Sequence, residues 1–260
     1  MLKPRGEAAA SGIAVLHAPD EFWPRLEPLG DRQSHHLLER YIPGEVFHVD
    51  SIVYRGEVLF AEVHQYGRPP LDIMQGAGGV FVTRRVQRGS ADEATLRDLN
   101  ARVIAALGLV NGVTHAEYIK ARDAGGRDDG EYYFLEIACR VGGANIAESV
   151  EAATGVNSWR EWARIEIDGG TGDYALPACR EDHAGVVISL AKQEWPDSAQ
   201  FADPEIAYRV IKRHHIGFVL AAPDHDRVQA LLDDYAHRIA RDYTTSVPAP
   251  DRLRIAADQR

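Results

Sequence analysis

Two glutamates in the middle of the sequence, Glu117 and Glu136, have the spacing that a shared metal ion requires. Each lies in a strand-like run, within residues 113–120 and 131–140, and the polar, glycine-rich stretch between the runs favours an antiparallel hairpin. In that hairpin the carboxylates fall nearly opposite each other, where Cβ atoms are about 5 Å apart and like charges repel. A hard cation such as Mg²⁺ relieves this repulsion, because it binds through one or two carboxylates and completes its shell with water and phosphate oxygens.

The second strand of this hairpin also contains a positively charged residue near the two glutamates. The period of two along a strand places Phe134, Ala138 and Arg140 on the face of Glu136. A guanidinium there suits a phosphate or a developing anion. The alternative is that both glutamates point to solvent at a sheet edge, because the sequence alone does not fix the strand register.

Hairpins and helices, rather than a regular alternation of strand and helix, surround this pair and favour an α+β fold. Residues 46–63 form strand-like runs broken at Arg55 and Gly56, and residues 64–79 form a loop rich in glycine and proline. Ser90 begins a helix that ends at Gly108. The other expected elements are a strand at residues 13–16, a short helix from Pro19, a helix from about Asn145, strands at residues 185–190 and 217–221, and a helix over residues 224–241.

Composition and charge disfavour several classes of protein. The chain has 260 residues, 45% hydrophobic and 26% charged, which is an ordinary globular balance. Its formal net charge of -10 disfavours nucleic acid and anionic membranes as partners. Cys139 and Cys179 belong to no CxxC pair or Cys/His cluster, so neither a zinc site nor a disulfide framework is expected. The absence of a signal-peptide pattern and of a long apolar run predicts a cytoplasmic protein.

Two segments of the sequence resemble the ATP-grasp superfamily. They read Asn-Gly-Val-Thr-His-Ala-Glu at residues 111–117 and Phe-Leu-Glu-Ile-Ala-Cys-Arg-Val-Gly-Gly-Ala-Asn-Ile at residues 134–146. The resemblance is greatest to the carboxylate-amine ligase branch, which includes bacterial L-amino-acid ligases that form dipeptides. It implies an ATP-grasp fold, an antiparallel sheet with flanking helices, in which Glu117 and Glu136 bind Mg²⁺ or Mn²⁺ on the phosphates of ATP.

The same resemblance assigns further roles around the metal site. Arg140 corresponds to the arginine that steadies the acyl phosphate or the tetrahedral species. Ala138 stands where many members have an asparagine that is a further metal ligand, which weakens the expectation of a second metal position. The residues expected beside the substrates are Gly78, Gly79, His115, Gly142 and Gly143.

The amino-terminal part of the chain resembles the nucleotide-binding residues of the family. Lys3 and a small-residue loop that reaches Ser11 and Gly12 are similar to the nucleotide-contacting lysine and the phosphate-covering loop, whose backbone N–H groups cradle anionic oxygens. For the loop the alternative is a surface turn. Residues 38–45 resemble the link between the two ATP-grasp lobes, and the alternative there is an ordinary strand with an exposed charge. This resemblance assigns Glu39 and Ile42 to adenine and Glu45 to ribose.

Other polar positions fit the cleft less specifically. His48 and His64 are plausible polar contacts there, although a lone histidine is more often structural or solvated. The glycine-rich residues 75–79 do not lie between a strand and a helix, so they are interpreted as a substrate-side loop and not as a dinucleotide-binding loop.

The resemblance divides the chain into three parts and implies a reaction. Residues 1–43 correspond to a remnant of the first ATP-grasp lobe, 44–168 to the second lobe with the metal site, and 169–260 to a carboxyl-terminal extension. We expect an amino-terminally truncated ligase that joins a small-molecule carboxylate to an amine through an acyl phosphate, with amino acids as candidate substrates. The alternative is a catalytically inactive nucleotide-binding or partner-binding fragment that needs a separate amino-terminal chain. Homo-oligomerisation stays open.

Overall fold

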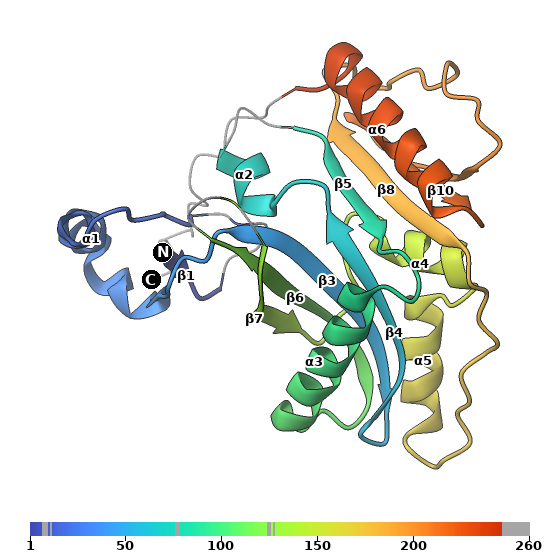
Figure 1. The fold of residues 1–260 in the computed structure, drawn as a ribbon, viewed down its shortest axis with the longest axis horizontal. Coiled ribbons are helices and arrows are strands. Elements are labelled where there is room, and N and C mark those ends of the chain that lie inside the picture. The colour runs from blue at the N-terminus through green and yellow to red at the C-terminus, as the bar shows by residue number, and fades with distance from the viewer. Residues whose placement is uncertain (7–9, 11, 76–78, 124–125, 127, 246–260) are drawn as a thin grey trace, which may run out of the picture.

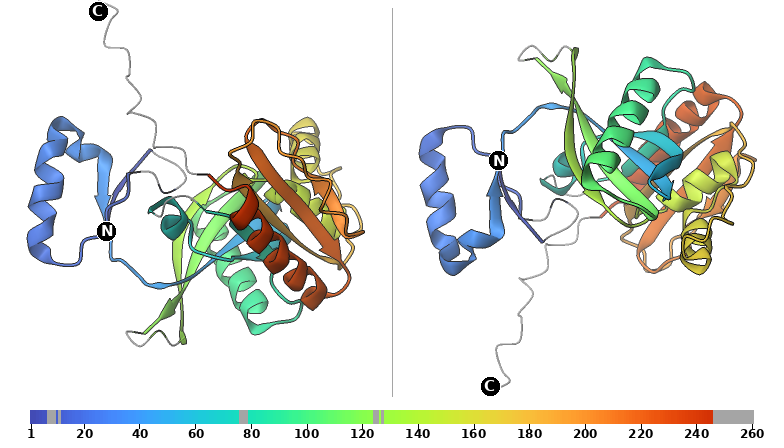
Figure 2. Two further views of the ribbon diagram at one scale, coloured as in Figure 1. Left: turned by 90° about the horizontal axis from the view of Figure 1, so that it is seen from above. Right: turned by 90° about the horizontal axis from the view of Figure 1, so that it is seen from below.

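The computed structural model describes residues 1–6, 10, 12–75, 79–123, 126 and 128–245. Within them, an eight-stranded sheet with helices on both faces forms the main body, and a small amino-terminal lobe projects to one side (Figures 1 and 2). Every strand pair in the large sheet is antiparallel, so the predicted α+β class with an antiparallel sheet is confirmed.

The small lobe contains a two-stranded sheet and short helices. Strand β1 (Leu2–Pro4) pairs with β2 (His36–Leu38), and the helix expected from Pro19 is present. The strand expected at residues 13–16 is wrong, because only an isolated bridge between Leu2 and Ala14 forms there. Between the two strands lie η1 (Pro19–Glu21), α1 (Phe22–Leu26) and η2 (Glu27–His35).

Two hairpins form the part of the large sheet that carries the candidate site. Strands β3 (Gly44–Tyr54) and β4 (Glu57–Tyr66) are joined by a tight turn in which Arg55 and Gly56 both have positive φ, at 53° and 82°. Such angles match the twist of the flanking strands. Strands β6 (Gly112–Arg122) and β7 (Asp128–Ala138) form the second hairpin, and β6 pairs with β3. Both predicted hairpins are confirmed.

The carboxyl-terminal part of the chain extends the same sheet. The strand order is β7-β6-β3-β4-β5-β8-β10-β9, with β5 at Phe81–Arg85, β8 at His183–Leu190, β9 at Ile206–Arg209 and β10 at His215–Ala222. Strands from both sides of the expected boundary at residue 168 therefore belong to one continuous sheet. The expectation of a loop over residues 64–79 is wrong in part, because β4 reaches Tyr66 and a short helix α2 (Pro70–Gln75) follows.

Helices cover both faces of the sheet. Helix α3 (Ala91–Leu107) is capped as predicted: Ser90 accepts a hydrogen bond from the backbone N–H of Glu93, and Gly108 ends the helix at φ 71°. Helices α3 and α6 (His225–Asp242) cover one face, and α4 (Ile146–Thr154) and α5 (Ser158–Asp168) cover the other. None of the helices in the described part of the chain combines the length and apolar character that a bilayer crossing requires.

Candidate functional site

The predicted glutamate pair is present in the hairpin of β6 and β7. Glu117 and Glu136 are direct register partners. The register shifts immediately afterwards, so that Tyr118 pairs with Phe134, and the two rings make an edge contact with centroids 6.0 Å apart. The expectation that Phe134 shares a face with Glu136 is therefore wrong, because the bulge breaks the period of two.

The two carboxylates have different surroundings. Tyr66 donates a hydrogen bond of 2.6 Å to Glu117 Oε1, and His115 Nε2 lies 3.5 Å from the same oxygen. Burial alone would raise the pKa of Glu117, but the hydrogen bonds from His115 and Tyr66 lower it. The side chain of Glu136 is 63% exposed, and desolvation together with the charge of Glu117 raises its pKa. One carboxylate is thus held in place and the other is free to turn toward a ligand.

A lysine from the small lobe reaches this pair. Lys3 Nζ lies 3.0 Å from Glu39 Oε2 and 4.0 Å from Glu136 Oε2, and the lysine side chain is only 12% exposed. The pairing of β1 with β2 fixes this position, because Lys3 is the register partner of Leu37, two residues before Glu39. Residues far apart in the sequence that were predicted to contact nucleotide and metal therefore meet in one place.

A row of buried polar side chains lies next to Glu117. Asp50 receives hydrogen bonds from Nδ1 of His115 (2.9 Å) and from Nδ1 of His48 (2.7 Å), while His48 Nε2 is 2.7 Å from Thr83 Oγ1. We call these four residues the polar row. Burial alone would lower the pKa of His115, but the charge and hydrogen bond of Asp50, with Glu117, raise it to about 10. For Asp50, burial alone would instead raise the pKa, but the two histidines hold it far below its usual range.

Asp50 belongs to the site but was not predicted from the sequence. The sequence feature that marks it is the alternation in β3, where the polar residues His48 and Asp50 interrupt a buried apolar run. In the structure these two residues pair with Glu117 and His115 of β6. Recognising that feature requires knowing that β3 pairs with β6. Of the histidines expected in the cleft, His48 and His64 are both fully buried, so the structural alternative holds for them.

His48, Asp50 and His64 also have the residue types of a metal site, with potential ligand atoms within 4.8 Å of one another. However, the rings of His48 and His64 are stacked with an interplanar angle of 2° and centroids 4.8 Å apart. Nitrogen lone pairs lie in the ring plane, so two parallel rings do not direct them at one ion. We interpret His64 as a packing residue that stacks on His48 of the polar row, and not as a third metal ligand.

Two of the glycines expected beside the substrates have different surroundings. A Cβ atom on Gly142 would lie 2.7 Å from Asp50 Oδ1 and 3.1 Å from His115 Nδ1, whereas Gly143 has open space around it. Gly142 is therefore needed for the close approach of the chain to the polar row. Gly79 accepts a hydrogen bond from Ser189 through its carbonyl oxygen. Gly78 lies outside the described residues.

The residues assigned to the nucleotide have different surroundings. Lys3 and Glu39 converge as described, Ile42 is half-buried, and Gly12 has a φ of 71°. Ser11 lies outside the described residues. Glu45 accepts a hydrogen bond from Arg122 and is out of phase with His48 along β3, which puts it on the sheet face opposite Glu117. Its position therefore does not support the ribose role.

The arginine assigned to the reacting group lies close to the pair. Arg140 donates a hydrogen bond of 3.0 Å from Nη1 to the carbonyl oxygen of Val141. Burial raises the pKa of both Tyr66 and Glu136, and the positive charge of Arg140 offsets a small part of each rise. The guanidinium therefore acts electrostatically on the residues around the two carboxylates. Its remaining donors leave it able to bind an anion.

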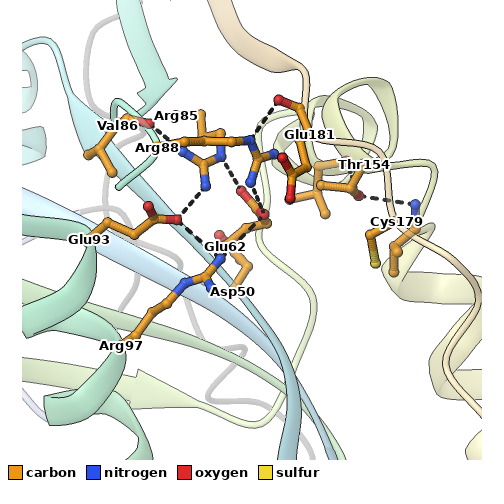
Figure 3. Close-up of polar contacts among 12 residues, drawn as sticks. Asp50, Glu62, Arg85, Val86, Arg88, Glu93, Arg97, Thr154, Cys179 and Glu181 are labelled. Atoms are coloured by element: carbon orange, nitrogen blue, oxygen red, sulfur yellow. Dashed lines mark hydrogen bonds and ion pairs between the residues drawn. The ribbon is translucent and has the colours of Figure 1, made fainter. Parts of the chain in front are cut away.

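An ion-pair cluster braces the sheet beside the polar row. The guanidinium of Arg85 is fully buried and donates to Glu62 (2.6 Å) and to Glu93 (2.5 Å), as Figure 3 shows. Arg88 links Glu62 to the backbone carbonyls of Glu181 and Asp182. The cluster ties β4, β5 and α3 to the segment that leads into β8, which fixes the frame in which Asp50 lies.

Comparison with known proteins agrees with this architecture. The chain is similar to an L-arginine-specific L-amino acid ligase from Bacillus subtilis, with 25% identity over 227 residues that cover 80% of this chain and 52% of the relative. The L-amino acid ligase structure from Bacillus licheniformis superimposes with a TM-score of 0.64 at 15% identity, over 95% of this chain and 62% of that one. No family model matches the chain.

A second solved structure has the same fold and contains nucleotide. It is the carboxyaminoimidazole ribonucleotide synthase from Aspergillus clavatus complexed with ATP, with a TM-score of 0.63 and 15% identity, over 92% of this chain and 62% of that one. The chain has the ATP-grasp fold. Its relatives are ATP-grasp ligases, so the predicted resemblance is confirmed, and the chain spans about half the length of the curated relative that it matches.

Proposed function

We propose that this chain carries the magnesium and ATP site of a carboxylate-amine ligase. The observation that carries the proposal is the convergence of Lys3, Glu39, Glu117 and Glu136, which join the small lobe to the large sheet. The relatives named above support the reaction class. Because the chain spans only about half of the curated relative, the whole reaction is part of the proposal. A cytoplasmic location stays a prediction.

The donor set fits a hard divalent cation. Two facing carboxylates supply oxygen ligands, and the pKa of Glu136 is raised by desolvation and, in addition, by the charge of Glu117, a repulsion that a cation would offset. Tyr66 and His115 occupy Glu117 Oε1 and leave its second oxygen for a ligand. Mg²⁺ bound here would offset the negative charge on the phosphate oxygens of ATP. Ala138 provides no side-chain donor, so Glu117 and Glu136 are the two protein ligands in the proposed site.

In the proposed reaction a substrate carboxylate attacks the γ-phosphorus of ATP and ADP leaves. An amine then attacks the acyl carbon and displaces phosphate, which gives an amide, ADP and phosphate. Lys3 offsets charge on the nucleotide phosphates, and Arg140 stabilises the anionic acyl phosphate. The polar row holds Glu117 in one orientation, because His115 is fixed between Asp50 and Glu117.

The remaining positions define the edges of the site in this proposal. Glu39 and Ile42, between β2 and β3, hold the adenine, and Gly79, Gly142 and Gly143 lie beside the substrates. His115 acts through Glu117 and not on substrate, since it is 7% exposed and both of its ring nitrogens face acidic groups.

The reaction is tested by phosphate release. The chain is incubated with ATP and Mg²⁺, with and without a mixture of L-amino acids that supplies both carboxylate and amine. We expect phosphate release that requires the amino acids and is lost in Arg140→Ala. Release that is independent of amino acids, or unchanged in Arg140→Ala, contradicts the ligase assignment.

A second candidate is a nucleotide-binding fragment without catalysis. Binding of MgATP requires only the metal and nucleotide residues, whereas phosphoryl transfer also depends on exact positioning of the second reactant. This candidate predicts Mg²⁺-dependent ATP binding without release of phosphate. Activity that appears only when a separately encoded amino-terminal chain is added would support this candidate.

A further inference from the structure

A second polar cavity lies at the ends of β3, β4 and β5. It has a volume of about 300 Å³, and its lining includes the side chains of Arg68, Arg84 and Arg122 together with Glu45 and Asp72. This volume is at the lower end of the range for small-molecule sites, about 300 to 1,000 Å³. It is large enough for a compact metabolite or an inorganic anion.

The register places the main polar groups of this cavity on the face opposite the glutamate pair. Gln65 pairs with Phe47 on one side and with Arg84 on the other, so the three share a face. Phe47 belongs to the apolar cluster under α3, which defines that face. His48, the partner of Glu117, is one residue out of phase and lies on the other face.

Arg84 is a half-buried cation without a carboxylate partner. Its only hydrogen bond in the described part of the chain is from Nη2 to Gln65 Oε1, at 3.1 Å, and no described carboxylate lies within 4.0 Å of it. Burial lowers its pKa, with Asp233 and Glu45 too distant to form an ion pair. Removing a guanidinium from water is costly unless an anion compensates. By contrast, the buried Arg85 next to it is paired with two glutamates.

The other charges of the cavity leave an excess of cation. Arg122 is paired with Glu45, while exposed Arg68 has no hydrogen bond or ion pair among the described residues. The lining therefore carries three guanidiniums and two carboxylates, and one carboxylate is already engaged. The planar forks of Arg68 and Arg84 suit bidentate recognition of a phosphate or a carboxylate.

We propose that this cavity binds a small anionic ligand, through a phosphate or carboxylate group held by Arg84 and Arg68, at a site separate from the glutamate pair. One residue, Tyr66, belongs to both sites. Tyr66 lines the cavity and donates its hydroxyl hydrogen to Glu117. The experiment therefore has to distinguish the two sites.

The test is calorimetric titration of inorganic phosphate and, separately, of succinate into the full chain at constant ionic strength. We expect saturable binding of at least one anion, weakened about tenfold or more in Arg84→Gln, because a charge-assisted hydrogen bond is lost. Arg68→Gln changes an exposed side chain and should keep the fold while weakening the same anion. The matched control is Arg102→Gln, since Arg102 is 73% exposed on α3 and distant in sequence from every cavity residue.

The two probes and one further variant assign the source of binding. Binding of phosphate only indicates a phosphorylated ligand, and binding of succinate only indicates a carboxylate. The Glu136→Ala variant should bind the anion as the wild type does, and saturating anion should leave MgATP binding in place. The proposal is overturned if neither anion binds, if both arginine variants bind as tightly as the control, or if Glu136→Ala abolishes anion binding.

Discussion

The large sheet buries two interiors of opposite character. Under α6, Phe218, Leu220 and Leu232 on β10 and α6 are fully buried, and the cluster around them is apolar apart from tyrosine hydroxyls. On the other face, beneath β3 and β6, equally buried positions carry the histidines and the aspartate of the polar row. Apolar burial stabilises a fold without regard to direction, whereas buried charges are costly unless paired in a fixed geometry. The polar row therefore adds orientation to the site at a cost in stability that the apolar interior offsets.

The largest expected effect comes from breaking the polar row. Asp50→Asn removes the carboxylate that pairs with the His115 imidazolium and leaves this buried cation only its longer contact to Glu117, which we expect to lower the free energy of unfolding by about 3 to 5 kcal/mol. Urea denaturation measures it. Asp98→Asn, at a site 72% exposed on α3, should change stability by less than about 0.5 kcal/mol. A change below about 1 kcal/mol for Asp50→Asn would show that the row is not charged as described.

A truncated side chain in the apolar interior should destabilise the fold nearly as much as Asp50→Asn, but it should leave nucleotide binding unchanged. We expect Leu220→Ala to lower the free energy of unfolding by about 2 to 5 kcal/mol, because Leu220 is fully buried. The affinity of the folded protein for MgATP should stay unchanged, as titration below the unfolding transition would show. Loss of nucleotide affinity in this variant would mean that the two interiors are coupled.

The third expected effect, the smallest when expressed per pH unit, is a decline in stability with rising pH that separates the two interiors. His115 has a folded pKa of about 10 against an ordinary value of 6.5, so between these values the folded state binds more protons than the unfolded state. Its contribution is complete below 6.5 and is lost as the pH rises toward 10, with a slope of up to about 1.4 kcal/mol per pH unit. Urea denaturation across this range should show the decline in the wild type and in Leu220→Ala. If Asp50→Asn keeps the same slope, the assignment to the polar row is wrong.

The elements with local signals could be predicted from the sequence. The turn at Arg55 and Gly56, the Ser90 cap and the Gly108 terminus each depend on a few adjacent residues, and all three are where the sequence placed them. Strand β5 was missed because its Thr-Arg-Arg end lacks a strand pattern, and the partners that compensate Arg85 come from β4 and α3. Helix α2 was missed because the proline and glycine around it read as a loop.

The same limit applies to the candidate site: residues that a local hairpin brings together could be predicted, and residues that long-range strand pairing brings together could not. The opposition of Glu117 and Glu136 follows from one hairpin, so its register could be inferred from the sequence. The roles of Asp50 and Tyr66 depend on β3 lying between β4 and β6, which is a long-range pairing that no local pattern encodes. Glu45 was assigned to ribose without knowledge of the strand phase, and the phase places it on the opposite face.

The most direct test of the metal and nucleotide site is calorimetric titration of MgATP into the wild-type chain and into Glu136→Ala. Glu57→Ala is the matched control, because Glu57 is exposed at the other end of the β3–β4 hairpin and has no ion pair among the described residues. We predict binding that requires Mg²⁺ in the wild type and in Glu57→Ala and that is lost in Glu136→Ala. Equal binding by Glu136→Ala, or no binding by a folded wild-type chain, would contradict the assignment of this site.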